Sequence, residues 1–460
     1  MLWNLNEIYK ALGIKKKINE NFLFNEISID SRKINKKSLF IPIKGENYDG
    51  HKFIDSVARK GIKACLVEKK KKHLIKNKKI FLIEVNDTLS SLKKLALYAR
   101  NRIINLKTIC VTGSNGKTTL KEWLKDTLKN NFVVYSNPGN FNNLIGMPIT
   151  LVNIPKNTEL CILELGMNTY GEIKELAKIA KPDIAIITNI GNAHIGNFKN
   201  IYEIAKEKSE IFSFLERNSI AIIPGDSDHS KFLNKKAKAK TDQIIIFGKN
   251  PNFQSKYEEE KRNLFLFHIS KKKIKLKKNI IFKNWENNIL IILSVMDTLK
   301  LNLKKNYKKL ESLRPLPGRG EILQIKKGSK KFFLIDESYN SNPNSLKMAV
   351  LDLNKEKYKL NEKILVIGDM LELGKFSKKM HMEIVPIISK IKPKLVITVG
   401  EFSKVISENL PSTISSYHFK KVFHMYNKLL NKIDNDDIVM VKGSNSTKLS
   451  MLIKFLSQGM

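Results

Sequence analysis

The chain has 460 residues, of which 83 are Lys or Arg and 44 are Asp or Glu, giving a formal net charge of +39 at pH 7. That length predicts two to four domains of about 100–200 residues each, and a hydrophobic fraction of 42% can give each domain a core, which excludes a disordered chain. Apolar runs fall short of the roughly 20 residues of a membrane-spanning helix, and the first residues lack the basic and apolar segments of a secretory signal.

The first predicted domain spans residues 1–106. Short apolar runs at 38–43, 64–68 and 80–85 predict strands. The spacing of apolar residues over 90–101 predicts a helix.

The second predicted domain spans 107–313. It begins with a strand at 108–111, a glycine-containing turn and a helix that ends near residue 129. Strands at 160–165 and 183–190 follow, with a helix at 171–180 between them. Strands that alternate with helices predict a mostly parallel sheet covered on both faces. A lysine-rich alternating stretch at 255–283 predicts antiparallel strands at the edge of this sheet.

The third predicted domain spans 314–460 and follows a linker in which Pro315, Pro317 and Gly318 interrupt the pattern. Strands at 332–336, 363–367, 394–399 and 437–441 alternate with helices, which predicts a Rossmann-like α/β domain. The whole chain is therefore predicted to be an α/β protein of three domains.

The charge leaves two interpretations open. A basic chain can bind nucleic acid, but recognition of phosphates and bases favours arginine, and most basic residues here are lysines spread along the chain. The alternative is a compositional bias of solvated surfaces. The three cysteines, Cys65, Cys110 and Cys161, are far apart and flanked by aliphatic residues, which predicts reduced core side chains of a cytoplasmic protein.

A phosphate-binding loop is predicted at residues 112–119, Thr-Gly-Ser-Asn-Gly-Lys-Thr-Thr, between a strand and a helix. Gly113 and Gly116 let backbone N–H groups turn towards phosphate oxygens, while the helix N-terminus and Lys117 add positive charge and a threonine hydroxyl can hold magnesium. The usual spacing places a glycine where Val111 stands, so this loop is a shortened variant. A plain turn is the alternative, and the flanking strand and helix disfavour it.

Two further polar residues lie where a site is expected. Glu164 interrupts a run that is apolar on both faces, and a carboxylate there is costly unless it is paired or binds a cation. His194 follows the strand at 183–190, and loops at the carboxyl ends of parallel strands line the site in such sheets. The alternatives are a strand-end carboxylate that caps a loop and a surface histidine.

Lys208 lies in the middle of an apolar helical stripe, whereas Lys206 falls off that stripe. The stripe comprises Ile201, Ile204, Ala205, Ile211, Phe212 and Leu215. Burial favours the neutral form of a lysine, and a neutral amine can react with carbon dioxide to give a carbamate, an anion that can bind a divalent cation. The alternative is a lysine whose stem packs while its ammonium group reaches solvent.

With these motifs in view, the chain resembles the Mur ligases, which build the peptide of bacterial cell-wall precursors with ATP. The matching segments, in chain order, are 112–119, Glu164–Asn168 (ELGMN), 192–196 (NAHIG) and 205–212 (AKEKSEIF). Further segments resemble the branch that adds D-alanyl-D-alanine to UDP-N-acetylmuramoyl-tripeptide. They are 30–32, 40–53, 137–150, 336–345, 366–374 and 441–446, so the resemblance covers nearly the whole chain.

The resemblance implies roles for individual residues. ATP would be bound by Gly113, Ser114, Asn115, Gly116, Lys117, Thr118 and Thr119, by Asn284 and Asn287 near the adenine, and by Arg319, Asp336, Tyr339 and Asn340 of the closing third domain. Thr118 and Glu164 would hold the Mg²⁺ of ATP, and Glu164, His194 and carbamylated Lys208 a second Mg²⁺. The catalytic residues would be Lys117, Glu164, His194 and Lys208. The UDP-sugar and its peptide would contact Ser31, Arg32, Lys44, Gly45, Asn140, Asn142 and Asn143.

One position departs from the family, whose terminal signature reads Lys-Gly-Ser-Arg, because Asn445 replaces the arginine. Lys442 or Lys448 is a candidate for the missing positive charge. The expected protein is a monomer that binds small-molecule substrates and no nucleic acid. The rival interpretations are a sister ligase that adds another amino acid and a basic nucleic-acid-binding ATPase.

Overall fold

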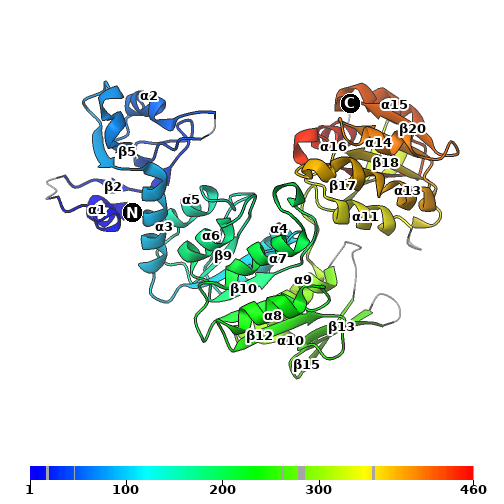
Figure 1. Ribbon diagram of the computed structural model, residues 1–460, viewed down its shortest axis with the longest axis horizontal. Helices are drawn as coiled ribbons and strands as arrows, with labels where there is room; N and C mark the ends of the chain where they lie inside the picture. The colour runs from blue at the N-terminus through cyan, green and yellow to red at the C-terminus, as the bar shows by residue number, and fades with distance from the viewer. Residues whose placement is uncertain (17–19, 46, 261–263, 278–284, 355–357, 459–460) are drawn as a thin grey trace.

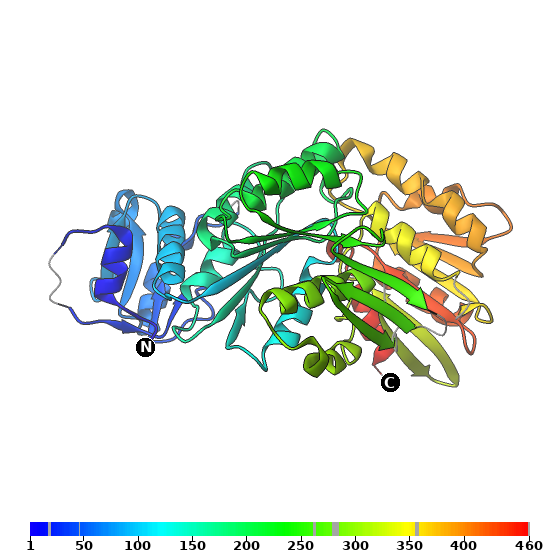
Figure 2. The same cartoon turned by 90° about the horizontal axis from the view of Figure 1, so that it is seen from below.

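The computed structural model describes residues 1–16, 20–45, 47–260, 264–277, 285–354 and 358–458. It has three α/β domains, each built on its own main sheet, arranged in a row with the second domain in the middle (Figure 1, Figure 2). Within the described residues, none of the helices is both long and apolar enough to cross a membrane.

The N-terminal domain has a sheet of four parallel strands in the order β3-β4-β5-β6. The strands are β3 (Glu26–Ser28), β4 (Ser38–Phe40), β5 (Ala64–Glu68) and β6 (Phe81–Val85), and a small pair, β1 (Trp3–Asn4) and β2 (Leu23–Phe24), lies beside them. The helices are α1 (Leu5–Leu12), α2 (Ile54–Arg59) and α3 (Thr88–Asn101). Helix α3 stands between this domain and the next, where it packs on α5 (Gly146–Val152) (Figure 1).

The central domain has a nine-stranded sheet in the order β15-β14-β13-β12-β11-β10-β7-β9-β8. Its parallel strands are β7 (Lys107–Thr112), β8 (Val134–Ser136), β9 (Leu160–Glu164), β10 (Ile184–Ile187), β11 (Ile220–Pro224), β12 (Gln243–Gly248) and β13 (Ser255–Glu260). For the predicted antiparallel stretch at 255–283, β14 (Leu264–Ile269) pairs antiparallel with β13 and with β15 (Lys272–Lys277), whereas β13 also pairs parallel with β12. Residues 261–263 and 278–283 of that prediction lie outside the described residues.

Successive side chains of β7 point to opposite faces of the sheet, which explains why both faces are covered. Ile109 and Val111 pack in a core with α4 (Lys117–Leu128), α9 (Trp285–Thr298) and α10 (Leu303–Glu311). Cys110 belongs to the other core, with α6 (Glu172–Ala180), α7 (Ile201–Ser209) and α8 (Ser230–Lys238). All three cysteines are free and buried, as predicted.

The C-terminal domain has a six-stranded sheet in the order β16-β17-β21-β18-β19-β20, parallel except for β16. The strands are β16 (Glu321–Lys327), β17 (Lys330–Glu337), β18 (Lys363–Gly368), β19 (Leu395–Val399), β20 (Ser415–Phe419) and β21 (Ile438–Lys442). The helices are α11 (Pro343–Asp352), α12 (Ser377–Met382), α13 (Val385–Ile391), α14 (Lys404–Glu408), α15 (Tyr426–Lys432) and α16 (Ser450–Ser457).

Several predicted elements differ in extent from the observed ones, and two strands end three residues early. The strand predicted at 183–190 ends at Ile187, because the chain then turns to pack against the phosphate loop. The strand predicted at 38–43 ends at Phe40. The helical stripe predicted around Lys208 is also narrower than expected, since Ile201, at the first residue of α7, is 37% exposed.

Candidate active site

The phosphate loop lies between β7 and α4, as predicted. Gly113 has φ +149°, and a Cβ at this position would lie 1.9 Å from Thr188 Oγ1 on the neighbouring strand end. Gly116 has φ +81° and begins α4, which has no side-chain hydrogen bond at its N-cap. The first-turn N–H groups of α4 are thus left without a side-chain cap, as an anion-binding helix start requires.

The loop that follows β10 holds the phosphate loop in place. The Ser114 hydroxyl and the Gly191 backbone bond each other reciprocally at 2.8 and 3.0 Å. The Asn115 N–H donates to Asn189 Oδ1 at 2.9 Å, and the Thr188 hydroxyl donates to the Asn115 carbonyl at 2.7 Å. These bonds hold the phosphate loop in its observed conformation.

Two lysines share one carbonyl oxygen of this loop. Lys117 Nζ donates to the Gly113 carbonyl at 2.7 Å and Lys208 Nζ donates to it at 3.0 Å. Burial lowers the pKa of Lys117, and burial together with the charge of Lys117 holds the pKa of Lys208 well below its usual value. Lys208 is 1% exposed and Lys206 is exposed, so the predicted burial of Lys208 is confirmed.

Glu164 is buried at the end of β9 beside this loop. Its Oε1 accepts a hydrogen bond from Asn142 Nδ2 at 2.7 Å, while its Oε2 is buried and has no hydrogen-bond partner among the described residues. The Asn137 side chain holds the Glu164 backbone on both sides: its Oδ1 accepts from the Glu164 N–H at 2.9 Å, and its Nδ2 donates to the Glu164 carbonyl at 3.0 Å. A buried carboxylate oxygen without a donor is costly, so this oxygen has the environment of a cation ligand.

His194 lies in the loop after β10, in the left-handed region with φ +63°. Its Nδ1 lies 2.7 Å from Oε2 of Glu372, which belongs to the C-terminal domain. The close approach of the His194 ring lowers the pKa of the Glu372 carboxyl against the opposing effect of burial, and the charge of Lys117 acts in the same direction as His194.

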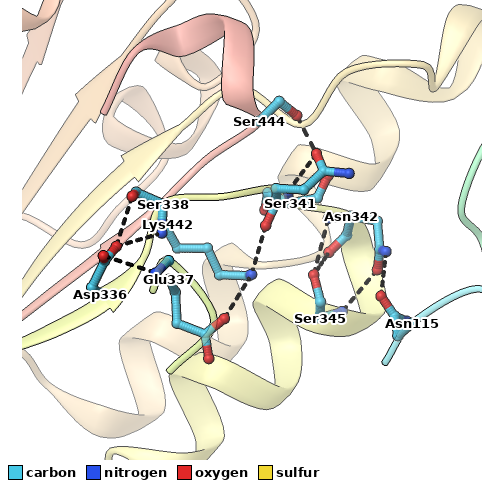
Figure 3. A network of polar contacts seen from close by, with 11 residues as sticks. Asn115, Asp336, Glu337, Ser338, Ser341, Asn342, Ser345, Lys442 and Ser444 are labelled. Carbon is cyan, nitrogen blue, oxygen red and sulfur yellow. Dashed lines mark hydrogen bonds and ion pairs between the residues drawn. The ribbon is translucent and has the colours of Figure 1, made fainter. Parts of the chain in front are cut away.

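The C-terminal domain also reaches the phosphate loop directly. Arg319 Nη2 donates to the Thr118 hydroxyl at 3.0 Å, and its guanidinium lies 3.9 Å over the Tyr339 ring. Asn342 Nδ2 donates to Asn115 Oδ1 at 2.6 Å, a contact visible at the lower right of Figure 3. The second and third domains therefore close around one cavity.

Figure 3 also shows how charged residues of β17 and β21 are arranged at this interface. The buried Lys442 is directed at Glu337, with Nζ 3.1 Å from Oε2, and it donates to the Asn340 carbonyl at 3.0 Å. The Asp336 carboxylate instead accepts from the Gly318 N–H and from the N–H and hydroxyl of Ser338, at 2.6–3.0 Å. Asp336 thus fixes the turn between the domains.

The cavity has a volume of about 1020 Å³. Most residues predicted for ATP or the peptide line it: Ser114, Asn115, Gly116, Lys117, Thr118, Thr119, Asn140, Asn142, Asn143, Glu164, His194, Arg319, Tyr339 and Asn340. Gly113 and Lys208 lie beneath the lining, joined to it through the bonds of the Gly113 carbonyl.

Some predicted residues lie elsewhere. The structure places Glu337 rather than Asp336, and Asn288 rather than Asn287, in the lining. Asn284 lies outside the described residues.

Ser31, Arg32, Lys44 and Gly45 lie on the N-terminal domain, away from this cavity lining. Lys44 and Gly45 are exposed, and the exposed Arg32 makes a bidentate pair with Asp30 at 2.9 Å. None of these four residues is part of the cavity lining.

Models of three Mur ligase domains match the chain in order. They are the Mur ligase family catalytic domain over 24–100, the Mur ligase middle domain over 111–296 and the Mur ligase, glutamate ligase domain over 318–445. A relative from Rickettsia prowazekii is named UDP-N-acetylmuramoyl-tripeptide–D-alanyl-D-alanine ligase and is 35% identical over 460 residues, covering 99% of this chain and 100% of the relative. The chain belongs to the Mur ligase family.

This Mur ligase is similar to further proteins over nearly their whole length. A relative of the same name from Bacillus subtilis is 31% identical and covers 95% of this chain and 94% of the relative. The crystal structure of MurF from Acinetobacter baumannii has a TM-score of 0.87 at 26% identity, covering 99% of this chain and 98% of that one. MurF ligase from Thermotoga maritima, in complex with ADP, has a TM-score of 0.80 at 27% identity, covering 95% and 98%.

In this Mur ligase Asn445, which the resemblance predicts to depart from the family signature, is exposed and lines the cavity. Lys442 already pairs with Glu337, whereas the exposed Lys448 also lines the cavity. Sequence reasoning missed Lys121, a fully buried lysine of α4 that donates to the Asn137 carbonyl, and Glu372. The position of Lys121, one helical turn after Lys117, was the available signal.

Proposed function

We propose that this Mur ligase joins D-alanyl-D-alanine to UDP-N-acetylmuramoyl-tripeptide with ATP, through an acyl phosphate. One observation carries the proposal: the phosphate loop, the Glu164 oxygen that has no donor among the described residues and the Asn140–Asn143 segment line one cavity that the third domain closes, with buried Lys208 bonded to the phosphate loop from beneath. The names of full-length relatives, at 31–35% identity, support the choice of substrates.

ATP would place its phosphates on the loop from Gly113 to Thr119, where the start of α4 and Lys117 supply positive charge. Arg319, Tyr339 and Asn340 would close on it from the third domain. On the adenine side, Asn288 is the asparagine of α9 that lines the cavity. We therefore propose that Asn288, beside the predicted Asn287, contacts the adenine. The ADP complex of the Thermotoga maritima relative supports the nucleotide.

The residues fit a divalent cation, because the Glu164 Oε2 oxygen is buried with no donor in the part of the chain that the structure describes, and Thr118 lines the same cavity. Thr118 and Glu164 would hold the Mg²⁺ of ATP, and Glu164, His194 and Lys208 a second one. When bound, these cations would neutralise charge on the phosphates and on the substrate carboxylate.

For Lys208 to take part, its neutral amine would add to carbon dioxide. An N–C bond forms as the π electrons of one C=O bond of carbon dioxide move onto its oxygen, the nitrogen passes one proton to water, and a carbamate anion results. The lowered pKa of Lys208, caused by burial and by Lys117, favours the neutral amine that this addition needs. The hydrogen bond from Lys208 to the Gly113 carbonyl places the amine beside the phosphate loop.

The remaining work of the chain is positioning. A carboxylate reacts with an amine only after phosphorylation makes one of its oxygens a good leaving group. Asn140, Asn142 and Asn143 would place the peptide carboxylate, and Asn142 is already held by Glu164. Lys117 would stabilise the phosphoryl group during transfer. Closure by the third domain would keep water from the acyl phosphate.

The UDP end of the substrate would bind the N-terminal domain. Ser31, Arg32, Lys44 and Gly45 would contact it, with Arg32 oriented by its bidentate pair with Asp30. This assignment separates recognition of the nucleotide-sugar from the reacting carboxylate. We also infer that the chain acts as a monomer in the cytoplasm, which size-exclusion chromatography and cell fractionation would test.

The test is amine-dependent phosphate release with UDP-N-acetylmuramoyl-tripeptide and ATP. D-alanyl-D-alanine should stimulate release, whereas single amino acids should not. Stimulation by a single amino acid alone would favour a sister ligase and overturn the proposal. A gel-shift assay at physiological salt should detect no nucleic acid binding, since that rival predicts tight, salt-dependent binding.

A further inference from the structure

The contact between Glu372 and His194 is built by both domains. Glu372 follows β18 in the loop before the turn at Gly374–Phe376, and it adopts a left-handed backbone with φ +62°. Its carbonyl accepts a hydrogen bond from the Gly196 N–H at 2.9 Å, and its Oε2 lies 2.7 Å from His194 Nδ1. Main chain and side chain of one residue therefore both engage the loop after β10.

The two loops approach so closely that only glycine fits. A Cβ on Gly196 would lie 2.6 Å from the Gly374 nitrogen and 2.7 Å from the Glu372 carbonyl oxygen. Real side chains do not tolerate such distances, so the contact depends on the absence of a side chain at Gly196. Because the two backbones pack this closely, the contact between Glu372 and His194 differs from an ion pair between two mobile surface side chains.

The loop that carries Glu372 is held rigidly by its own domain. The Asp369 carboxylate accepts three backbone N–H groups at 2.7–3.0 Å, those of Glu401, Phe402 and Ser403. The Met370 N–H donates to His381 Nε2, and the Leu371 N–H donates to the Ser444 hydroxyl, both at 3.0 Å. Glu372 therefore moves with the third domain as a fixed part of it.

The known chemistry of cation-binding histidines suggests a role for the contact between Glu372 and His194. Such a histidine binds the cation through one ring nitrogen and commonly donates from the other to a carboxylate, which fixes the tautomer and the ring orientation. Here Oε2 of Glu372 lies 2.7 Å from Nδ1 as an ion-pair contact, although the N–H is not aligned on the oxygen as a hydrogen bond, and this proximity leaves Nε2 as the nitrogen for a cation. The carboxylate belongs to a different domain from the histidine.

We propose that Glu372 is a positioning residue that orients His194 across the domain boundary, so that the second cation site is complete only when the third domain closes. The inference rests on the proposed function and deepens it. Closure would strengthen cation binding, and by linkage the cation would favour closure to the same extent. Phosphoryl transfer would then be supported only in the closed enzyme, where water is excluded.

The test uses the full chain with Glu372→Ala and Glu372→Gln. Glu362→Gln is the matched control, because Glu362 is an exposed carboxylate of the same domain. Mn²⁺ is titrated by electron paramagnetic resonance in the presence of a non-hydrolysable ATP analogue. Glu372→Ala should weaken the second, weaker Mn²⁺ equivalent by about 10–100-fold, while Glu372→Gln, whose amide oxygen can still accept from Nδ1–H, should lose less. The control should match the wild type.

Nitrogen NMR of the histidine rings supplies a readout that needs no activity, with His194→Gln used for assignment. Wild-type His194 should carry its proton on Nδ1 when the ring is neutral, Glu372→Gln should keep this tautomer, and Glu372→Ala should lose it. An unchanged tautomer and unchanged Mn²⁺ binding in Glu372→Ala would overturn the inference. Loss of the selectivity for D-alanyl-D-alanine in a wild type with the expected tautomer would instead overturn the proposed function alone.

Discussion

Replacing Lys208 with methionine should separate stability from activity. The methionine keeps most of the buried stem and removes an amine whose pKa burial holds well below its usual value. The Gly113 carbonyl retains its bond from Lys117, so the loss is one neutral hydrogen bond, about 1 kcal/mol. Removal of a desolvated polar group offsets part of that loss. Above the usual lysine pKa of 10.5, where the amine is neutral in both the folded and the unfolded chain, the unfolding free energy should therefore change by no more than about 1 kcal/mol, and at lower pH the variant should be the more stable protein.

The pH dependence of the difference has a definite sign. In the unfolded chain Lys208 is protonated up to its usual pKa of 10.5, whereas the folded amine is neutral well below that pH. In that window the unfolded state binds one more proton, so wild-type stability rises with pH by up to about 1.4 kcal/mol per unit from this group. Lys208→Met removes this contribution, and its stability relative to the wild type should fall as pH rises.

The assay combines urea unfolding in carbon dioxide-free buffer at several pH values with phosphate release. Ligation should drop by at least about 100-fold, since a ligand of the second cation is lost, and short carboxylates should restore part of it. Lys206→Met, on the exposed side of the same helix, should leave both measurements unchanged. Unimpaired ligation, or an unchanged pH slope of stability in Lys208→Met, would refute the reasoning.

Three further predictions concern the elements around the site. Gly113→Ala should lower the free energy of unfolding by urea by roughly 2–5 kcal/mol, because it combines a positive φ with a clash against Thr188. The control Gly13→Ala, with φ +71° and open space around it, should lower it by only about 1–2 kcal/mol. Equal losses in the two variants would contradict the argument. Lys121→Met should raise the KM for the tripeptide substrate about 10-fold by freeing the Asn137 carbonyl, and an equal rise in the KM for ATP would count against this role. Burial raises the pKa of the cysteine thiols, that of Cys161 to about 12, so a thiol reagent at pH 8 should label the native protein only at the rate of unfolding. Rapid labelling would be inconsistent with three thiols buried in the core. The contribution of the thiols to stability should decline as pH rises above about 9, where the unfolded thiols lose their protons and the folded ones keep them.

Periodicity was a good guide to the centre of an element and a poor guide to its ends. Lys208 was found from the sequence because apolar residues surround it at helical spacing, and it is 1% exposed. Ile201 fits the same stripe but is 37% exposed, because it begins α7, where the neighbouring elements no longer cover it. Apolar periodicity therefore predicts burial less well at the end of a helix than in its middle.

Contacts between domains had no sequence signal of their own. Glu372 lies far from His194 in the chain, and its role depends on how the third domain closes. Within the motif at 336–345, residue types predicted a site, but they could not assign the cavity to Glu337 and the supporting turn to Asp336. That choice depends on the alternation of side chains along β17, which is fixed only when the strand pairs with β21.

The most direct test of the central claim is a competition experiment read by mass spectrometry. The enzyme receives UDP-N-acetylmuramoyl-tripeptide, ATP and Mg²⁺ with D-alanyl-D-alanine and single amino acids together. The account predicts one product, whose mass increase corresponds to the dipeptide, with ADP and phosphate formed in equal amounts. A product that carries a single amino acid, or ATP hydrolysis without any ligated product, would contradict it.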